Sequence, residues 1–182
     1  MSRDPVELSE WLQRGYAPAF RTACLILHNR ADAEEAVQEA FLRVWRFRAA
    51  VPAGEGVQPW LYRVVVNACL SKLRTENRHR ARTGAAADGE LVEMASGPES
   101  LAVAGDTQRA VIGALAELPE HLRVVVALRY YAGLSEREIA AVIRRRPGTV
   151  KSRLHDAKAR LGADPRLVAL RDAQAEPQGS AS

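Results

Sequence analysis

The chain has 182 residues, enough for one ordinary domain or two small ones, and its composition, 47% hydrophobic but only 5% aromatic, favours helices over sheets. No apolar run reaches the roughly 18 residues that a membrane span needs, and Cys24 and Cys69 stand alone, without the spacing of a zinc or redox site. The formal net charge of +4 permits a polyanionic partner, and these features together predict an all-α protein of the reducing cytoplasm with no metal, no cofactor and no membrane-inserted segment.

The positive charge is concentrated in one part of the chain. Residues 107–165 carry 11 Lys or Arg against 6 Asp or Glu, whereas residues 81–106 carry 1 against 5. The Ala-, Gly- and Ser-rich residues 83–106 lack periodicity, which predicts a flexible linker. We therefore expect two small helical domains, residues 5–82 and 107–165, joined by that linker and followed by a C-terminal tail, residues 166–182, that extends the last helix before fraying.

The N-terminal residues are predicted to form two helices. Residues 7–28 show apolar side chains at helical spacing with Pro18 in the middle, which indicates one helix or a broken pair. Asn29 is expected to cap the C-terminal end. A second helix is expected from Asp32 to about Phe47, because its acidic first turn suits the helix dipole.

This second helix carries two apolar stripes. Val37, Ala40, Phe41 and Val44 make the usual core stripe. A second stripe, off the core face, mixes Leu and Trp with polar side chains, which favours contact with a protein partner, although packing under neighbouring helices is an equal alternative. Its members are Glu35, Gln38, Leu42 and Trp45.

A third helix is predicted from Pro59 to about Arg80, after a Gly- and Pro-rich loop. One face is basic and polar, and it lies opposite an apolar face that can pack inward. A basic face with aromatic residues at its start suits single-stranded DNA, the alternative being a solvated charged face. Trp60 is expected in the core rather than as a stacking platform. The basic face holds Arg63, Asn67, Ser71, Arg74 and Arg78; the apolar face holds Leu61, Val65, Cys69 and Leu73.

The C-terminal half contains the pattern of a helix-turn-helix. Ser135 and Glu138 form a capping box that starts one helix, and Pro147 starts the next. Val150 and Leu154 are expected to anchor the second helix to the core. Outward side chains then suit the major groove of DNA: Lys151, Ser152, His155 and Lys158. Arg144, Arg145 and Arg146 at the turn are interpreted as phosphate contacts or, equally, as a solvated charge run.

Two segments in this order carry a family resemblance. Residues 32–46 read DAEEAVQEAFLRVWR, and Leu118-Pro119-Glu120 precedes the helix-turn-helix of residues 134–154. With them the chain resembles an extracytoplasmic-function (group IV) sigma factor of bacterial RNA polymerase from about Leu8 to Leu161. The resemblance implies a non-enzymatic factor that binds core RNA polymerase and promoter DNA, helps to melt the start site, is released after initiation and is often held inactive by an anti-sigma factor. It implies no small-molecule substrate.

The resemblance also implies roles for individual residues, with the first domain as sigma region 2 and the second as sigma region 4. The loop of residues 49–58 resembles one that captures a flipped base of the −10 element. The polymerase-binding set is Asp32, Glu35, Gln38, Glu39, Leu42 and Trp45. The −10 set is Trp60, Arg63, Asn67, Ser71, Arg74 and Arg78. The −35 set is Arg144, Arg145, Arg146, Thr149, Lys151, Ser152, Arg153, His155 and Asp156.

Three positions depart from the family pattern. Ser71 stands where the family often has Asp, and Asp156 stands where a basic residue is common. Arg144 occupies a turn position at which the family usually has Gly. If Arg144 must be left-handed, the cost is about 1–2 kcal/mol, so the turn is expected to be remodelled with Gly148 taking part of the bend.

Two other functional classes compete with this interpretation. A LuxR-type regulator shares the helix-turn-helix pattern, but its receiver domain needs alternating strands and helices where residues 1–80 predict only helices. A polymerase-binding adaptor without promoter recognition is the other. An enzyme is disfavoured because the four histidines are scattered and neither a nucleophile–histidine arrangement nor a phosphate loop is present. These histidines are His28, His79, His121 and His155.

Overall fold

The computed structural model describes residues 5–52, 56–83 and 105–175, and within them every regular element is a helix. The all-α prediction is therefore confirmed. Most of the predicted linker, residues 84–104, lies outside the described residues, as do residues 53–55 of the predicted base-capturing loop and residues 176–182 of the tail. The elements are α1 (Pro5–Leu27), α2 (Arg30–Arg46), the 3-10 helix η1 (Arg48–Ala50), α3 (Val57–Thr83), α4 (Gly105–Ala116), α5 (Glu120–Tyr130), α6 (Glu136–Ile143), α7 (Pro147–Gly162) and α8 (Pro165–Ala175).

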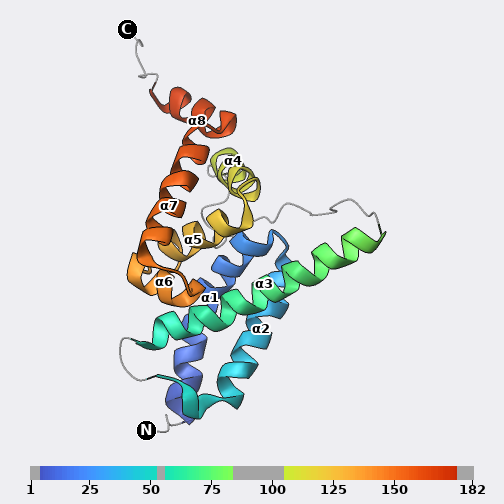
Figure 1. Cartoon of the computed structure of the whole chain (residues 1–182), viewed down its shortest axis with the longest axis vertical. Helices are drawn as coiled ribbons and strands as arrows, with labels where there is room; N and C mark the ends of the chain where they lie inside the picture. The colour runs from blue at the N-terminus through green and yellow to red at the C-terminus, as the bar shows by residue number, and fades with distance from the viewer. Residues whose placement is uncertain (1–4, 53–55, 84–104, 176–182) are drawn as a thin grey trace.

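The helices form two groups that touch. α1, α2 and α3 pack against one another, and α4 to α8 form the second group, as Figure 1 shows. α3 crosses the molecule, with its first half beside α6 and its last turns extending away from the other helices. The first half of α3 therefore contacts both groups of helices, and its last turns contact neither.

α1 is one continuous helix, not a broken pair. Pro18 lies inside it, and the hydroxyl of Thr22 donates to the Pro18 carbonyl at 2.9 Å. Proline removes one helical donor and normally favours a break. Here the helix is held on both sides of the proline by buried Leu8, Ala19 and Ile26, so tertiary packing outweighs the local preference.

A tight corner joins α1 to α2. His28 ends α1 in the left-handed conformation (φ 54°), and its N–H donates to the Cys24 carbonyl. Asn29 is the N-cap of α2, because its side chain accepts from the N–H of Asp32 at 2.9 Å. The predicted C-cap role of Asn29 was therefore wrong, and α2 begins at Arg30 rather than at Asp32.

The helix-turn-helix of the second group is built as its sequence predicts. Ser135 and Glu138 make the reciprocal capping box that starts α6. Ile139 is fully buried, as are Val150 and most of Leu154 on α7. These apolar contacts fix the angle between the two helices and leave the opposite side of α7 to solvent.

The turn between α6 and α7 takes its bend at Arg144. Arg144 is left-handed (φ 52°, ψ 51°), and the N–H of Arg145 donates to the Ala140 carbonyl at 3.0 Å, which closes the end of α6. The expected role of Gly148 was wrong, because Gly148 has no positive φ; among the described glycines, Gly133 has one. Arg144 therefore bears the whole left-handed strain.

Hydrogen bonds connect the two groups of helices. The Nε of Arg123 in α5 donates to the Ile26 carbonyl in the last turn of α1 at 3.1 Å. The Nε2 of Gln58 in α3 donates to the Ala132 carbonyl at 3.3 Å. Beside Arg123, burial and then the guanidinium charge lower the pKa of His28 to about 4, so its ring is neutral at pH 7. The two predicted domains are thus in direct contact.

The predicted extension of the last helix into the tail was wrong, because α7 ends at Gly162 and a separate α8 follows. Arg166 at its start pairs with Asp164 and, at 2.9 Å, with Glu117 beyond the end of α4. A Cβ added to Gly113 would lie 2.8 Å from the Arg166 guanidinium. Because Gly113 has no side chain, the Arg166 side chain has space to pack against α4 and so to hold α8 there.

Replacing Arg144 by Gly should stabilise the protein. The change relieves about 1–2 kcal/mol of left-handed strain and adds unfolded-chain freedom of roughly 0.4–1 kcal/mol, so we expect a net gain of about 0.5–1 kcal/mol and a higher thermal midpoint. Arg145→Gly is the matched control and should lower the midpoint, because Arg145 does not have a positive φ. A midpoint for Arg144→Gly at or below the wild-type value would contradict the strain argument.

Candidate nucleic-acid interface

α7 presents a polar face to solvent along its first three turns. Its buried side consists of Val150, Leu154 and Ala157. The hydroxyl of Ser152 donates to the Thr149 carbonyl at 3.1 Å, so its oxygen remains able to accept a bond. The −35 set divides by exposure: Lys151, Ser152, His155 and Asp156 are exposed, and Thr149 and Arg153 are half-buried.

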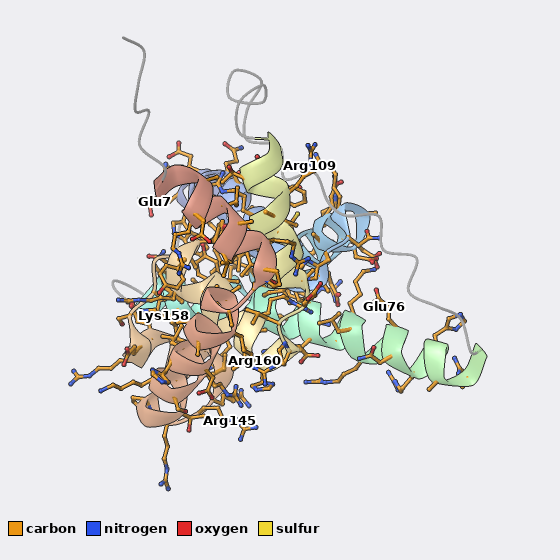
Figure 2. The ribbon with its side chains drawn as sticks, turned by 90° about the horizontal axis from the view of Figure 1, so that it is seen from above. Glu7, Glu76, Arg109, Arg145, Lys158 and Arg160 are labelled. Carbon is orange, nitrogen blue, oxygen red and sulfur yellow. The ribbon has the colours of Figure 1, made fainter. Side chains whose placement is uncertain are left out.

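The turn before α7 adds three exposed arginines, Arg144, Arg145 and Arg146. Figure 2 places Arg145 and Lys158 on the outer side of the second group of helices, where both side chains are exposed. Arg and Lys at a helix N-terminus and along its outer face are suited to phosphate contact. The exposed members of the predicted −35 set therefore lie on α7 and the turn before it, while Thr149 and Arg153 are partly covered.

The −10 set on α3 is split into two parts. Asn67, Ser71, Arg74 and Arg78 are exposed, and the Arg78 side chain is held along the helix because its Nε donates to the backbone carbonyl of Arg74 at 3.2 Å. The opposite face is buried as expected, with Leu61, Val65, Cys69 and Leu73 in the core. Burial raises the pKa of the Cys69 thiol to about 12 and that of Cys24 to about 11, so both thiols stay protonated.

Trp60 and Arg63 form the second part, at the contact between α3 and α6. Both are half-buried, and Trp60 packs against the core. They line a cavity of about 610 Å³, together with Pro52, Gly56 and Pro59 on one side and Ser135, Arg137, Glu138 and Ala141 on the other. Hydrogen bonds from the hydroxyl and N–H of Ser135 lower the pKa of Glu138. The first residues of the −10 face, Trp60 and Arg63, therefore face the second group of helices.

The second stripe of α2 lies on the surface. Leu42 is 68% and Trp45 41% exposed, although both are large and apolar, which excludes the core alternative for them. The guanidinium of Arg48 lies 5.9 Å from the Trp45 ring centroid. Phe47 is also exposed and extends this apolar surface.

The acidic members of the polymerase-binding set are paired. The Nζ of Lys72 on α3 lies 2.8 Å from a carboxylate oxygen of Asp32 and 2.6 Å from one of Glu35. Glu39 pairs with Arg43 on its own helix. Gln38 is exposed, as are Glu35 and Glu39, whereas Asp32 is half-buried. The structure thus brings the whole set onto one side of α2.

Sequence reasoning missed several residues of these surfaces. Lys72 was not singled out, because its partners lie on another helix, and Arg137 was not, although it is exposed beside the cavity. A search for charged residues flanking each predicted face would have found Lys72 and Arg137.

Neither a metal cluster nor a membrane-crossing helix occurs within the described ranges. They contain no group of three or more His, Cys, Asp or Glu side chains placed to hold a metal ion. None of the described helices combines the length and apolar character needed to cross a membrane.

Comparison with known proteins identifies both groups of helices. The family description "Sigma-70 region 2" matches residues 12–79, and "Sigma-70, region 4" matches residues 108–161. The ECF RNA polymerase sigma-E factor of Escherichia coli K12 is 31% identical over 134 residues, which are 70% of each chain. The RNA polymerase sigma-H factor of Pseudomonas aeruginosa PAO1 is 28% identical over 171 residues, covering 84% of this chain and 89% of that one.

Solved structures share the fold. The sigma factor RpoE of Bartonella quintana, in complex with the anti-sigma factor NepR, superposes with a TM-score of 0.69 at 24% identity, covering 85% of this chain and 92% of that one. CnrH, in complex with the cytosolic domain of CnrY, gives 0.63 at 21% identity, covering 94% and 92%. On its two regions and its sequence identity, the chain belongs to the sigma-70 family of RNA polymerase sigma factors, in its extracytoplasmic-function (ECF) group.

Proposed function

We propose that this sigma factor binds core RNA polymerase through α2 and directs initiation at promoters whose −35 element is read by α7 and whose −10 element is read by α3. The observation that carries the proposal is the division of α7 into two sides. Val150, Leu154 and Ala157 hold it to its domain, while Lys151, Ser152 and His155 stay accessible. We assign region 2 to residues 5–82, region 4 to residues 107–165, and linker and tail roles to residues 83–106 and 166–182.

At the −35 element, α7 enters the major groove of the duplex. The arginines before its N-terminus contact phosphates and set its position, and Lys151 and Arg153 contact phosphates or guanine edges. Asp156 is exposed on the same helix and can accept a hydrogen bond from the amino group of cytosine, while it repels phosphate. Asp156 therefore gives this factor a −35 preference of its own.

At the −10 element, α3 contacts the separated strand. Asn67 and Ser71 supply hydrogen-bonding groups, and Arg74 and Arg78 supply positive charge along the same face. Trp60 and Arg63 line the cavity between the two regions, so we propose that α6 moves away from them when they contact DNA. Strand reading at the start of the face is then accompanied by separation of the regions.

The exposed apolar stripe of α2 supports docking to polymerase. A protein interface places large apolar side chains at its centre and polar groups around them. Leu42 and Trp45 provide such a centre, and Glu35, Gln38 and Glu39 surround it. Carboxylates in this stripe favour a cationic partner surface.

An anti-sigma factor is proposed as a further partner. The two structural neighbours are sigma factors described in complexes with NepR and with the cytosolic domain of CnrY. We place the action of this chain in the cytoplasm, with its polymerase, and assign it no catalytic residue, cofactor or small-molecule substrate. Compared with these roles, a LuxR-type regulator is disfavoured because α1, α2 and α3 replace the strands of a receiver domain.

Run-off transcription with purified core polymerase, the full chain and a pool of promoter fragments from the source genome tests the proposal. We expect transcripts from fragments that share one −35/−10 pair, and none when the chain is omitted. Absence of transcripts, with the chain folded and the polymerase active, would favour the adaptor or the regulator. A gel shift with and without polymerase then separates those two.

Lys151→Ala and Arg153→Ala should each weaken binding of the holoenzyme to its promoter. If the side chain neutralises a phosphate, its removal makes the slope of log K against log salt shallower by about 0.9. The weakening is then greatest at low salt. Gel shifts at several salt concentrations measure the slope, and Arg171→Ala, on exposed α8, is the matched control. An unchanged slope in both variants would remove the phosphate role.

Leu42→Ala combined with Trp45→Ala should reduce the affinity for core polymerase while leaving the fold intact. An apolar anchor at the centre of an interface contributes about 2 kcal/mol or more, so we expect affinity to fall by at least roughly 30-fold. Fluorescence anisotropy with labelled protein measures it, and circular dichroism checks the helices. Unfolding of the variant, or unchanged affinity in a folded variant, would contradict the docking role.

A further inference from the structure

Lys72 belongs to none of the three predicted contact sets, yet it binds two residues of one of them. Its ammonium lies between a carboxylate oxygen of Asp32, at 2.8 Å, and one of Glu35, at 2.6 Å. Asp32 and Glu35 are one turn apart on α2, so a single cation bridges both. The three side chains together carry a net charge of −1.

Lys72 also adjoins the −10 face of α3. Ser71, Arg74 and Thr75 around it are exposed, whereas Cys69 and Leu73 are buried. The Lys72 side chain is 21% exposed and points to α2, on the flank of α3 next to the exposed Ser71 and Thr75. A flexible four-carbon stem allows its ammonium to reach either α2 or that exposed flank.

The ammonium keeps its charge in this position. Burial lowers the pKa of Lys72, but hydrogen bonds to Asp32 and then Glu35 outweigh burial, and the net direction is upward. Ion pairs with an exposed partner such as Glu35 contribute little net free energy, because water and salt screen them. The pair with Asp32 is more covered, with side chains 21% and 26% exposed, so a docking partner's cation has to reach Asp32 as well as Glu35 to replace Lys72.

We propose that Lys72 is a further DNA-contacting residue, held by Asp32 and Glu35 in the free protein and released toward a −10 phosphate when cationic groups of the polymerase take over the two carboxylates. This inference rests on the proposed function. It makes docking and DNA binding thermodynamically coupled through one side chain. By reciprocity, DNA that binds Lys72 raises the affinity for polymerase by the same factor.

The test imitates release by removing the carboxylate charges. In the full chain without polymerase, Asp32→Asn with Glu35→Gln should bind a fluorescein-labelled single-stranded oligonucleotide of about 20 nucleotides roughly 3- to 10-fold more tightly at about 50 mM salt, with a log–log salt slope steeper by about 0.7. Adding Lys72→Met should abolish this gain. In the otherwise wild-type free chain, Lys72→Met should change the affinity by less than about twofold, because the ammonium is already occupied.

Two controls separate release from the removal of negative charge. Glu34→Gln removes one charge next to Glu35, and Glu34 has no contact with Lys72 among the described ion pairs, so its effect measures the removal of one negative charge. The double variant removes two, so release is indicated only by a gain in binding free energy of more than twice that effect. The triple variant Lys72→Met, Asp32→Asn and Glu35→Gln leaves no unpaired charge at this place. We therefore expect it to fold even where Lys72→Met alone does not. Comparing the triple with the double variant then still tests the role of Lys72.

The outcomes are distinct. If the Asp32→Asn and Glu35→Gln variant keeps its tighter DNA binding after Lys72→Met is added, the inference is overturned. Weaker DNA binding by Lys72→Met alone in the free chain also overturns it. If the wild-type chain and Lys72→Met, each bound to polymerase, bind promoter DNA with the same affinity, the inference is overturned and the proposed function is intact. If the wild-type chain with polymerase binds no promoter DNA, the proposed function fails and the inference fails with it.

Discussion

The guanidinium of Arg123 is bonded to the backbone of both regions. Arg123 donates to the Ile26 carbonyl in the last turn of α1 and to the Ala116 and Leu118 carbonyls at the end of α4, each at 3.1 Å. The last carbonyls of a helix have no partner within it, and the planar donors of Arg can satisfy several at once. Burial lowers the pKa of Arg123, yet its pairing with carbonyls suits the charged form. These bonds join α5 to α1, and α6, the next helix along the chain, packs against α3.

α3 takes part in three features of the structure. Its exposed side carries Asn67, Ser71, Arg74 and Arg78 of the predicted −10 set, its Lys72 pairs with Asp32 and Glu35 of α2, and its first turns line the cavity beside α6. Figure 1 shows the C-terminal turns of α3 apart from the other helices, which leaves Arg74 and Arg78 accessible while the start of the helix is covered.

Features fixed by local periodicity or capping could be predicted from sequence. The two sides of α2 and of α3 and the Ser135–Glu138 box follow from spacings of three and four residues, and the structure has them as expected. Features decided by distant residues could not. Packing keeps α1 straight through Pro18, and Asn29 caps α2 because α1 already ends at His28. The Lys72 bridge joins residues far apart in sequence, for which no spacing rule exists. The sequence position of Arg144 indicated that left-handed strain was possible. Whether the strain fell on Arg144 or was shared with Gly148 depended on how α6 and α7 pack.

The cavity shared by Trp60, Arg63 and α6 alters how any affinity of α3 is measured. If a ligand binds those two side chains only when the regions are apart, its apparent Kd equals the intrinsic Kd divided by the fraction of molecules in that state. At a fraction of about 1%, the apparent Kd is about 100-fold weaker. A protein that merely holds the regions apart removes this factor without contacting the ligand, and one that holds them together strengthens it. Arg137 and Ala141 line the cavity from α6, so a substitution at either position can change that fraction without altering Trp60 or Arg63.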